Sequence, residues 1–354
     1  MTHPLPNSLT IALDAMGGDA APAIVIDGAA RVLEQQPDLR FLLFGDAPRL
    51  EPLLAGHPDL RERSTVHHTP DSVAGDAKPS VALRQGRNTS MRLAINAVKD
   101  GAAAAAVSAG NTGALMAMAK VVLKTLPGVD RPAMASVMPA QQRPVVILDL
   151  GANMECGAEH LFQFAVMGEV YARVMLGVAK PRVGLLNVGT EELKGDDVVR
   201  GAAAMLRDSL LPIDFHGFVE GTDVTAGVVD VVVTDGFTGN VALKIAEGTA
   251  AMFTAALREA IRGGGWRSKL GYLMAKPAFA ILRSKFDPRR YNGAMFLGLN
   301  GVVVKSHGGT DALGFAAAIA VAADLVRKGT NERIIEEMGA IRPVPQAPAH
   351  ATAS

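Results

Sequence analysis

The sequence predicts an α/β protein of three layers, in which helices cover both faces of a mostly parallel sheet. Short apolar runs are followed repeatedly by a glycine-rich polar loop and then by a helix-like pattern. Several of these runs are continuously apolar, which is typical of strands that are buried on both faces. Apolar residues make up 49% and charged residues 20% of the 354-residue chain, so it can build a substantial core.

The expected elements follow one another in a regular order. A first strand at 9–14 leads through a loop to a helix near 23–36. The uncharged stretch 101–119 resembles a membrane span in composition, but its central Gly, Asn and Thr residues indicate a strand, a loop and a helix. A further helix is expected from about residue 158. The strand-and-loop pattern also occupies residues 39–46, 143–156, 182–197, 228–252 and 302–314.

Composition excludes several classes of protein. The net charge is zero, which gives no support for nucleic-acid binding. The N-terminus lacks the charged and apolar regions of a signal peptide, and the single cysteine, Cys156, rules out an internal disulfide framework. We therefore expect a cytoplasmic protein with one catalytic α/β/α domain at 1–342. The Pro- and Ala-rich tail at 343–354 is expected to be disordered.

The first loop contains more polar chemistry than a turn requires. Asp14 and Asp19 bracket the pair Gly17-Gly18, where the first strand gives way to the first helix. A plain turn needs at most one residue of each kind, whereas a ligand site at the carboxyl edge of a parallel sheet can use all four. The first loop is therefore a candidate binding loop.

Two later loops have the composition of anion-binding sites. Both follow a strand and open a helix, where unpaired backbone N–H groups and the helix dipole favour phosphate. If the two loops converge on one edge of the sheet, they form a phosphate site; the alternative is that their polar side chains only cap helices. The candidates are Ser108, Asn111 and Thr112 in one loop, and Thr238 and Asn240 in the other.

Two further loops supply basic residues. Lys194 lies beyond the carboxyl end of the expected strand at 182–188, where a mobile ammonium suits a phosphate or a developing oxyanion. The alternative is a solvated surface charge. Lys305 and His307 follow another strand, and the histidine is either a proton shuttle or a structural residue of a turn. The other candidate binding residues beside Lys194 are Asn187, Gly189 and Thr190.

Several familiar chemistries find no support in the sequence. The chain lacks a P-loop motif, a G-x-G-x-x-G after the first strand, an H-E-x-x-H and a G-x-S-x-G. His67-His68 is too close a pair to suggest a zinc site alone, so no metal and no cofactor are expected. Cys156, near Glu155 and His160, is conceivable as a thiol nucleophile, but a buried structural cysteine is the favoured interpretation.

Residues 261–286 form a basic segment that breaks the repeated pattern. The segment contains six Lys or Arg residues, no Asp or Glu, and the only tryptophan. Gly263–Gly265 and Pro277 are expected to divide it into the two short helices of a basic amphipathic hairpin. Three interpretations stay open: a dimer-interface or core hairpin, a dock for an acidic carrier protein, and a membrane-surface hairpin. In the last, the membrane contacts are Trp266, Leu270, Leu273, Met274, Phe279 and Leu282.

Six motifs follow one another along the chain: "LDAMGGD", "SAGNTGAL", "LDLGANMEC", "LLNVGTEELKGDD", "VVTDGFTGNVALK" and "VVVKSHGGTDALG". In this order, they resemble the bacterial phosphate acyltransferase family, the acyl-[acyl-carrier-protein]:phosphate acyltransferases of phospholipid synthesis. The resemblance runs from about residue 9 to residue 340. One departure is "YNGAMFLG" at 291–298, where many members have a Tyr-Gly-Gly-Ala-Pro-like run.

The resemblance implies a reaction between an acyl-carrier-protein thioester and inorganic phosphate, which gives acyl phosphate and free carrier protein. A membrane-bound glycerol-3-phosphate acyltransferase then uses the product. The family also implies a homodimer with a fold like those of phosphate acetyltransferases and isocitrate/isopropylmalate dehydrogenases, and a reversible association with the membrane. Since phosphate is the nucleophile, such an enzyme needs no covalent residue.

The resemblance also implies roles for the candidate residues. Lys194 is expected to bind phosphate and stabilise charge, and Asn240 to position the carbonyl or the phosphate. His307 is a further catalytic candidate, and Lys305 a further phosphate-binding one.

The aspartates and glycines of the first loop would then serve the same site. Gly17-Gly18 would let the backbone approach the ligand, while Asp14 and Asp19 would orient the basic groups. A carboxylate that faced phosphate directly would repel it, so at least one of the two acids must pair with a lysine or be protonated.

Three alternatives belong to different classes of protein. A phosphate acetyltransferase would use a coenzyme A thioester. A decarboxylating NAD-dependent dehydrogenase would need metal-binding aspartates and arginines for a dicarboxylate, and the sequence offers no such cluster. A non-enzymatic, membrane-recruited scaffold would explain the basic segment but not the polar loops at several strand ends. Formation of acyl phosphate from a long-chain acyl-carrier protein, without metal or nucleotide, separates these alternatives.

Overall fold

The structure, a computed structural model, describes residues 8–340, in which eleven strands form one sheet. The tail expected to be disordered at 343–354 lies outside the described residues. The strands are β1 (Leu9–Asp14), β2 (Leu39–Gly45), β3 (Ser64–His68), β4 (Ala105–Ser108), β5 (Ala133–Met138), β6 (Val145–Leu148), β7 (Arg182–Leu186), β8 (Asp214–Val219), β9 (Val231–Val233), β10 (Ala294–Leu297) and β11 (Val302–Lys305).

The sheet consists of two parallel blocks that run in opposite directions. Its strand order is β3-β2-β1-β4-β11-β10-β5-β6-β9-β7-β8. The first block comprises β3, β2, β1, β4 and β11, and the second comprises β6, β9, β7 and β8. Between them, β10 is antiparallel to β11 and β5, and β5 is antiparallel to β6. The carboxyl ends of the two blocks therefore lie at opposite edges of the sheet.

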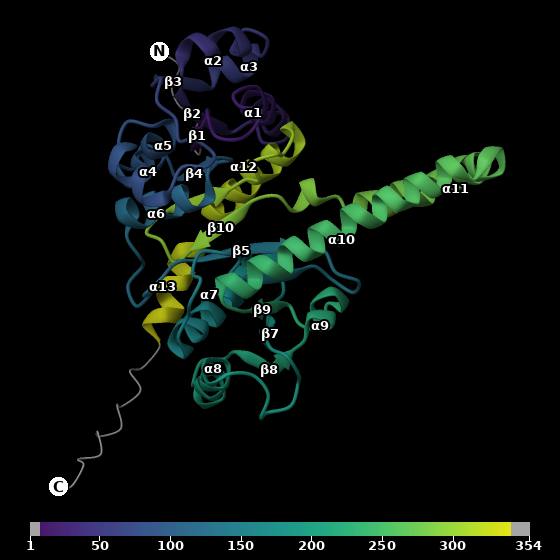
Figure 1. The fold of residues 1–354 in the computed structure, drawn as a ribbon. Coiled ribbons are helices and arrows are strands. Elements are labelled where there is room, and N and C mark those ends of the chain that lie inside the picture. Colours follow the sequence, from purple (N-terminus) through teal and green to yellow (C-terminus); the bar gives the residue numbers. More distant parts are fainter. Residues whose placement is uncertain (1–7, 341–354) are drawn as a thin grey trace.

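Helices cover both faces of this sheet, which confirms the predicted three-layer α/β/α fold (Figure 1). One face carries α1 (Ala23–Gln35), α7 (Ala158–Leu176), α8 (Asp197–Asp208), α12 (Ala312–Arg327) and α13 (Thr330–Gly339). The other carries α4 (Pro79–Gln85), α5 (Ser90–Lys99), α6 (Thr112–Leu123), α9 (Gly221–Ala226) and the start of α10 (Gly236–Gly263). The remaining helices are α2 (Ala47–Leu54), α3 (Pro58–Glu62), α11 (Gly265–Lys285) and the 3-10 helix η1 (Pro288–Tyr291).

Helices α10 and α11 form a hairpin that extends away from the rest of the chain (Figure 1). The prediction of two short helices within 261–286 is wrong, because α10 begins at Gly236 and α11 continues through Pro277. The glycines do mark the turn: Gly265 has a φ of +69°, which a residue without a Cβ adopts readily. Pro277 removes one backbone hydrogen bond, and α11 nevertheless runs on to Lys285.

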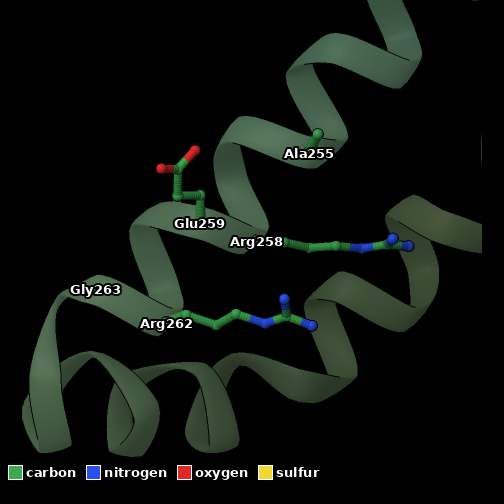
Figure 2. Close-up of a pocket in the computed structure, with 5 residues that line it drawn as sticks. All are labelled: Ala255, Arg258, Glu259, Arg262 and Gly263. Atoms are coloured by element: carbon green, nitrogen blue, oxygen red, sulfur yellow. The ribbon is translucent and has the colours of Figure 1, made fainter.

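The hairpin exposes many large apolar side chains to solvent. Beside its turn, Arg258 and Arg262 of α10 extend toward the space next to α11, whereas Glu259 points away from it (Figure 2). Among the described residues, no helix is both long and apolar enough to cross a membrane. The large exposed apolar residues described on these helices are Phe237, Val241, Ile245, Met252 and Phe253 on α10, and Trp266, Leu270, Tyr272, Leu273, Met274 and Ile281 on α11.

Truncation of a core leucine tests this assignment of the layers. Leu43 in β2 is fully buried, so Leu43→Ala should lower the free energy of unfolding by about 2–5 kcal/mol through lost burial and the cavity left behind. Leu210, which is 86% exposed, is the matched control, and Leu210→Ala should change the free energy by less than about 0.5 kcal/mol. Urea unfolding measures both; equal effects would contradict the layer assignment.

Candidate active site

Asp14 is the centre of a buried polar cluster at the carboxyl end of β1. Its carboxylate accepts hydrogen bonds from Ser90 Oγ and Ser108 Oγ, each at 2.6 Å, and from Met16 N at 3.3 Å. Burial raises the pKa of Asp14, while these donors and the charge of Lys305 oppose the rise. Because Ser90 opens α5 and Ser108 ends β4, one carboxylate connects three elements of the first block.

Lys305 lies near this carboxylate, at the end of β11. The residue is only 8% exposed, and its Nζ donates to Ala109 O at 3.4 Å and to Ser306 O. Burial lowers the pKa of Lys305 from 10.5 to about 8, although the carboxylates of Asp14 and Asp19 act in the opposite direction. Since an ammonium has three donors, Lys305 can donate to an anion besides these two carbonyls.

The loops after β1, β4 and β11 contact one another around this lysine. Asp19 N donates to Gly308 O at 3.0 Å, which joins the first and last of these loops. A Cβ at Gly17 would lie 2.5 Å from Asp14 Oδ2 and 2.7 Å from Gly110 N, so only glycine fits there. The close packing of the first loop against the loop after β4 therefore depends on this glycine.

His307 is held by the loop after β11 while its side chain stays exposed. Its backbone N donates to Asn292 Oδ1 at 2.9 Å, and its Nδ1 accepts a hydrogen bond from Gly309 N at 3.2 Å. In the neutral ring, this contact assigns the proton to Nε2. The histidine thus combines a structural contact at Nδ1 with an Nε2–H that can donate to a ligand.

Asp149 organises a second polar cluster, at the carboxyl end of β6. Its buried carboxylate accepts hydrogen bonds of 2.7–3.0 Å from the backbone N of Met134, Ala152 and Asn153, and from Asn153 Nδ2. Burial raises the pKa of Asp149, and these donors oppose the rise. Gly236 N donates to Asn153 O at 2.7 Å, so the ordered loop holds the start of α10.

Asn240 lies in the first turns of α10, against the same loop. A Cβ at Gly239 would lie 1.9 Å from Asp149 O, so glycine alone permits this approach of helix and loop. A Cβ at Gly151 would lie 3.6 Å from Asn240 Cβ, which places the asparagine side chain next to the loop. The Asn240 side chain is exposed and can therefore reach a ligand.

Lys194 is exposed in the loop after β7. Asn187 Nδ2 donates to Lys194 O at 3.1 Å, and Lys194 N donates to Glu191 O at 3.0 Å, which closes the loop on itself. Gly189 and Thr190 belong to the same loop. Because β7 and β9 are parallel neighbours, the loops that carry Lys194 and Asn240 leave the sheet at the same edge.

Three predicted binding residues take part in helix starts. Asn111 caps α6, since its Oδ1 accepts a hydrogen bond from Ala114 N at 2.9 Å, and Thr112 is the first residue of that helix. Asn111 is therefore a helix cap, as the capping alternative requires, and its role in binding stays a prediction. Asp235 caps α10 and accepts hydrogen bonds from both the N and the Oγ1 of Thr238. Thr238 therefore contributes to the start of the helix without being its cap.

The loops after β4 and β9 leave the sheet at opposite edges, so the condition for a phosphate site formed by both loops at one edge is not met. β4 belongs to the first block and β9 to the second, and the antiparallel strands between the blocks reverse the direction. Helix α10 supplies the connection instead. Lys244 follows Asn240 by one helical turn, about 6 Å along the axis, and its charge lowers the pKa of Lys305.

Ser90, Asp149 and Lys244 are site residues that the sequence analysis did not single out. Asp149 carried the same signal as Asp14, an acid at a strand end before a glycine, and could have been found. Ser90 acts on a residue 76 positions away, so no local pattern could have indicated it. The position of Lys244 depends on the direction in which α10 leaves the sheet.

Cys156 is poorly suited to be a nucleophile. Burial, together with the nearby charges of Asp149 and Asp235, raises the pKa of its thiol to about 11. The thiol is therefore protonated at neutral pH, whereas attack requires the thiolate. Among the side chains that the structure describes, no three His, Cys, Asp or Glu residues are grouped to hold a metal ion.

The fold is shared with enzymes that transfer acyl groups. The structure is similar to a phosphotransacetylase from Streptococcus pyogenes, with a TM-score of 0.59, 18% identity, and coverage of 92% of this chain and 95% of that one. A branched-chain phosphotransacylase from Enterococcus faecalis V583 gives a TM-score of 0.55 at 14% identity, over 90% and 99% of the chains. These likenesses define the chain as an α/β/α protein with the phosphotransacylase fold.

The chain belongs to the family described as Fatty acid synthesis protein, whose model matches residues 9–333. It is 56% identical over 346 residues to the Phosphate acyltransferase of Paramagnetospirillum magneticum, covering 98% of each chain. It is 60% identical over 339 residues to the Phosphate acyltransferase of Rhodospirillum centenum, covering 96% of this chain and 95% of that one. The predicted family is thereby confirmed, and the chain is an acyltransferase of fatty acid and lipid synthesis.

The pKa of Lys305 predicts how anion binding depends on pH. Its ammonium is charged below about pH 8 and neutral above, so affinity for inorganic phosphate should fall as the pH rises through that value. In Lys305→Arg, the guanidinium stays charged and the fall should move to higher pH. Calorimetric titration with phosphate between about pH 7 and pH 10 measures both proteins; the same pH dependence in wild type and Lys305→Arg would contradict this role.

Proposed function

We propose that this chain transfers a fatty acyl group from an acyl-[acyl-carrier-protein] to inorganic phosphate, which gives acyl phosphate for phospholipid synthesis. The observation that carries the proposal is the buried ammonium of Lys305, surrounded by three glycine-containing loops at the carboxyl ends of β1, β4 and β11. Such a site suits a small anion. The relatives' name, Phosphate acyltransferase, supports phosphate as the anion.

The proposed reaction is a single displacement at the thioester carbonyl. An oxygen of phosphate attacks the carbonyl carbon, and a C–O bond forms in a tetrahedral oxyanion. The C–S bond then breaks, and the carrier's sulfur leaves as a thiolate that takes up a proton. Because phosphate itself is the nucleophile, the protonated thiol of Cys156 takes no part.

The two clusters divide the work of this reaction. Lys305 holds phosphate in the first cluster, and the Nε2–H of His307 donates a hydrogen bond to the leaving sulfur, whose thiolate then takes up a proton from solvent. Lys194, from the loop after β7, stabilises the oxyanion, and Asn240, beside the second cluster, positions it. The charge of Asp14 favours the ammonium form of Lys305, while the hydrogen bonds of Asp14 are with Ser90, Ser108 and Met16. The reaction needs neither metal nor nucleotide.

Formation of acyl phosphate from long-chain acyl-carrier protein and phosphate tests the function, and Lys194→Ala tests the role of the lysine. Loss of one charge-stabilising group at such a site costs about 3 kcal/mol, so turnover should fall about a hundredfold or more with little change in melting temperature. Lys99→Ala, at the exposed end of α5, is the control and should retain wild-type turnover.

Two results would overturn these assignments. If the wild type is active and Lys194→Ala has the same turnover at saturating phosphate, Lys194 has no role in catalysis, while the proposed function stands. A wild type that forms acyl phosphate only from an acyl-coenzyme A thioester replaces the proposed donor.

The proposal includes a homodimer that binds the membrane surface reversibly through the α10–α11 hairpin. The exposed apolar side chains of the hairpin support it, among them Trp266 at 70% and Met274 at 77% exposure. Arg267 stacks over the Trp266 ring at 5.6 Å, as expected of residues placed at a headgroup boundary. Phe279 is half-buried against the Tyr272 ring, with 5.2 Å between centroids. The side chain of Leu282 lies outside the described ones.

Replacing Leu273 and Phe279 together with glutamate tests the membrane proposal. The added charges should abolish binding to anionic vesicles and spare activity on soluble substrate. Leu210→Glu, which adds a charge at an exposed position away from the hairpin, should leave vesicle binding unchanged. Vesicle flotation at low salt measures binding, and survival of binding in the double variant contradicts the proposal. Loss of activity in a variant that stays dimeric instead favours docking of the carrier protein on the hairpin.

A further inference from the structure

We propose that Asn292 is a positioning residue, which holds the loop at 306–311 so that Lys305 and His307 keep the arrangement that acyl transfer requires. The inference rests on the proposed function, since it assigns those two residues to phosphate and to the leaving group. Asn292 follows η1 directly and precedes β10, so it belongs to a different part of the chain from the loop it contacts.

The side chain of Asn292 uses both of its ends on that loop and on the helix behind it. Its Nδ2 donates to Ser306 Oγ and to Gly314 O, each at 2.8 Å, and is 3.4 Å from Thr310 Oγ1. Its Oδ1 accepts a hydrogen bond from His307 N at 2.9 Å. One amide therefore fixes the beginning of the loop, its end and the first turn of α12.

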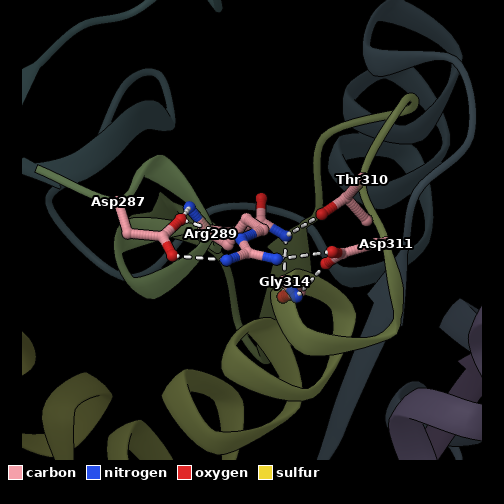
Figure 3. A network of polar contacts seen from close by, with 6 residues as sticks. Asp287, Arg289, Thr310, Asp311 and Gly314 are labelled. Carbon is pink, nitrogen blue, oxygen red and sulfur yellow. Dashed lines mark hydrogen bonds and ion pairs between the residues drawn. The ribbon is translucent and has the colours of Figure 1, made fainter. Parts of the chain in front are cut away.

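A second contact from η1 holds the far end of the same loop. Arg289 Nη1 donates to Asp311 Oδ2 at 2.8 Å, and Asp311 in turn caps α12 by accepting from Gly314 N at 3.0 Å. Figure 3 shows Arg289 between Asp287 and Asp311, with Thr310 and Gly314 nearby. The guanidinium keeps the pKa of Asp311 below its usual value, so this contact persists at neutral pH. The loop is thus held at both ends by one short segment.

The position of this loop decides the surroundings of both reacting groups. Lys305 Nζ donates a hydrogen bond to the backbone carbonyl of Ser306. The side-chain hydroxyl of the same serine accepts a hydrogen bond from Asn292 Nδ2. His307 Nδ1 accepts a hydrogen bond from Gly309 N, and the backbone N of His307 donates one to Asn292 Oδ1. A shift of the loop would therefore move an acceptor of the ammonium and the ring of the histidine together. No contact of Asn292 with a substrate is needed for this effect.

Asn292→Ala removes these contacts and keeps a backbone conformation that alanine adopts, since Asn292 is extended with φ −73° and ψ 138°. The KM for phosphate should rise about tenfold. The pKa of Lys305, about 8, predicts an alkaline limb of kcat/KM near that pH in wild type, and in the variant this limb should move to higher pH as the ammonium gains access to water. The charged groups around this ammonium, Asp14, Asp19 and Lys244, are unchanged in the variant.

Asn331→Ala is the matched control. Asn331 Nδ2 donates to Leu299 O at 2.9 Å, so this variant also loses a structural amide contact, at a position away from the loop. It should lower the melting temperature without moving the KM for phosphate or the alkaline limb. A merely structural role of Asn292 would give the same pattern as the control. If Asn292→Ala does not fold, Asn292→Ser takes its place, because the shorter hydroxyl cannot make all of these contacts.

The outcomes separate this inference from the proposed function. If the wild type makes no acyl phosphate, the proposed function itself is wrong. If the wild type is active but Asn292→Ala has an unchanged KM for phosphate and an unchanged alkaline limb, only the positioning role is overturned. A raised KM and a shifted limb in Asn292→Ala, absent in Asn331→Ala, support it.

Discussion

Lys305 carries an ammonium into the interior at the end of β11, where transfer out of water destabilises the charged form. The polar groups packed around this ammonium are arranged as its burial requires. Asp14 is held nearby by two serines, and the loops after β1, β4 and β11 pack together through backbone contacts. The pKa of Lys305 is about 8 in the folded chain, against an ordinary value of 10.5. At pH values between these two, the unfolded chain therefore binds a proton that the folded chain does not. Burial of Lys305 therefore lowers stability at neutral pH, which is understandable if the charge serves a ligand.

The reversal of strand direction between the two blocks shapes the rest of the site. Because β10 and β5 reverse the direction of the sheet, the loops of the second block leave at the opposite edge. Helix α10 overcomes this separation, since it starts against the Asp149 loop and presents Lys244 close enough to act on Lys305. The same helix continues into the hairpin, so an element of the site is covalently continuous with the exposed apolar surface (Figure 1).

Much of the fold could be predicted from local pattern. The strands of both blocks that precede binding loops, such as β1 and β7, appear as apolar runs before glycine-rich stretches, and α7 begins where expected. The antiparallel strands β5 and β10 were missed because they lack such a loop. The length of the hairpin helices was not predicted, because Pro277 is a strong local signal for a break, whereas α11 continues through Pro277 and contacts α10.

By itself, the sequence determined the three layers, the glycine-rich loops that follow the strands and the identity of the family, because each depends on residues that are close together in the chain. Only the tertiary structure decided which loops share an edge of the sheet, since strand direction depends on pairing between distant segments. It also brought Ser90 to Asp14 and Asn292 to His307, pairs that no local pattern connects. The physical reason is that a buried charge or amide selects partners by distance in space, and distance in space is set by the fold.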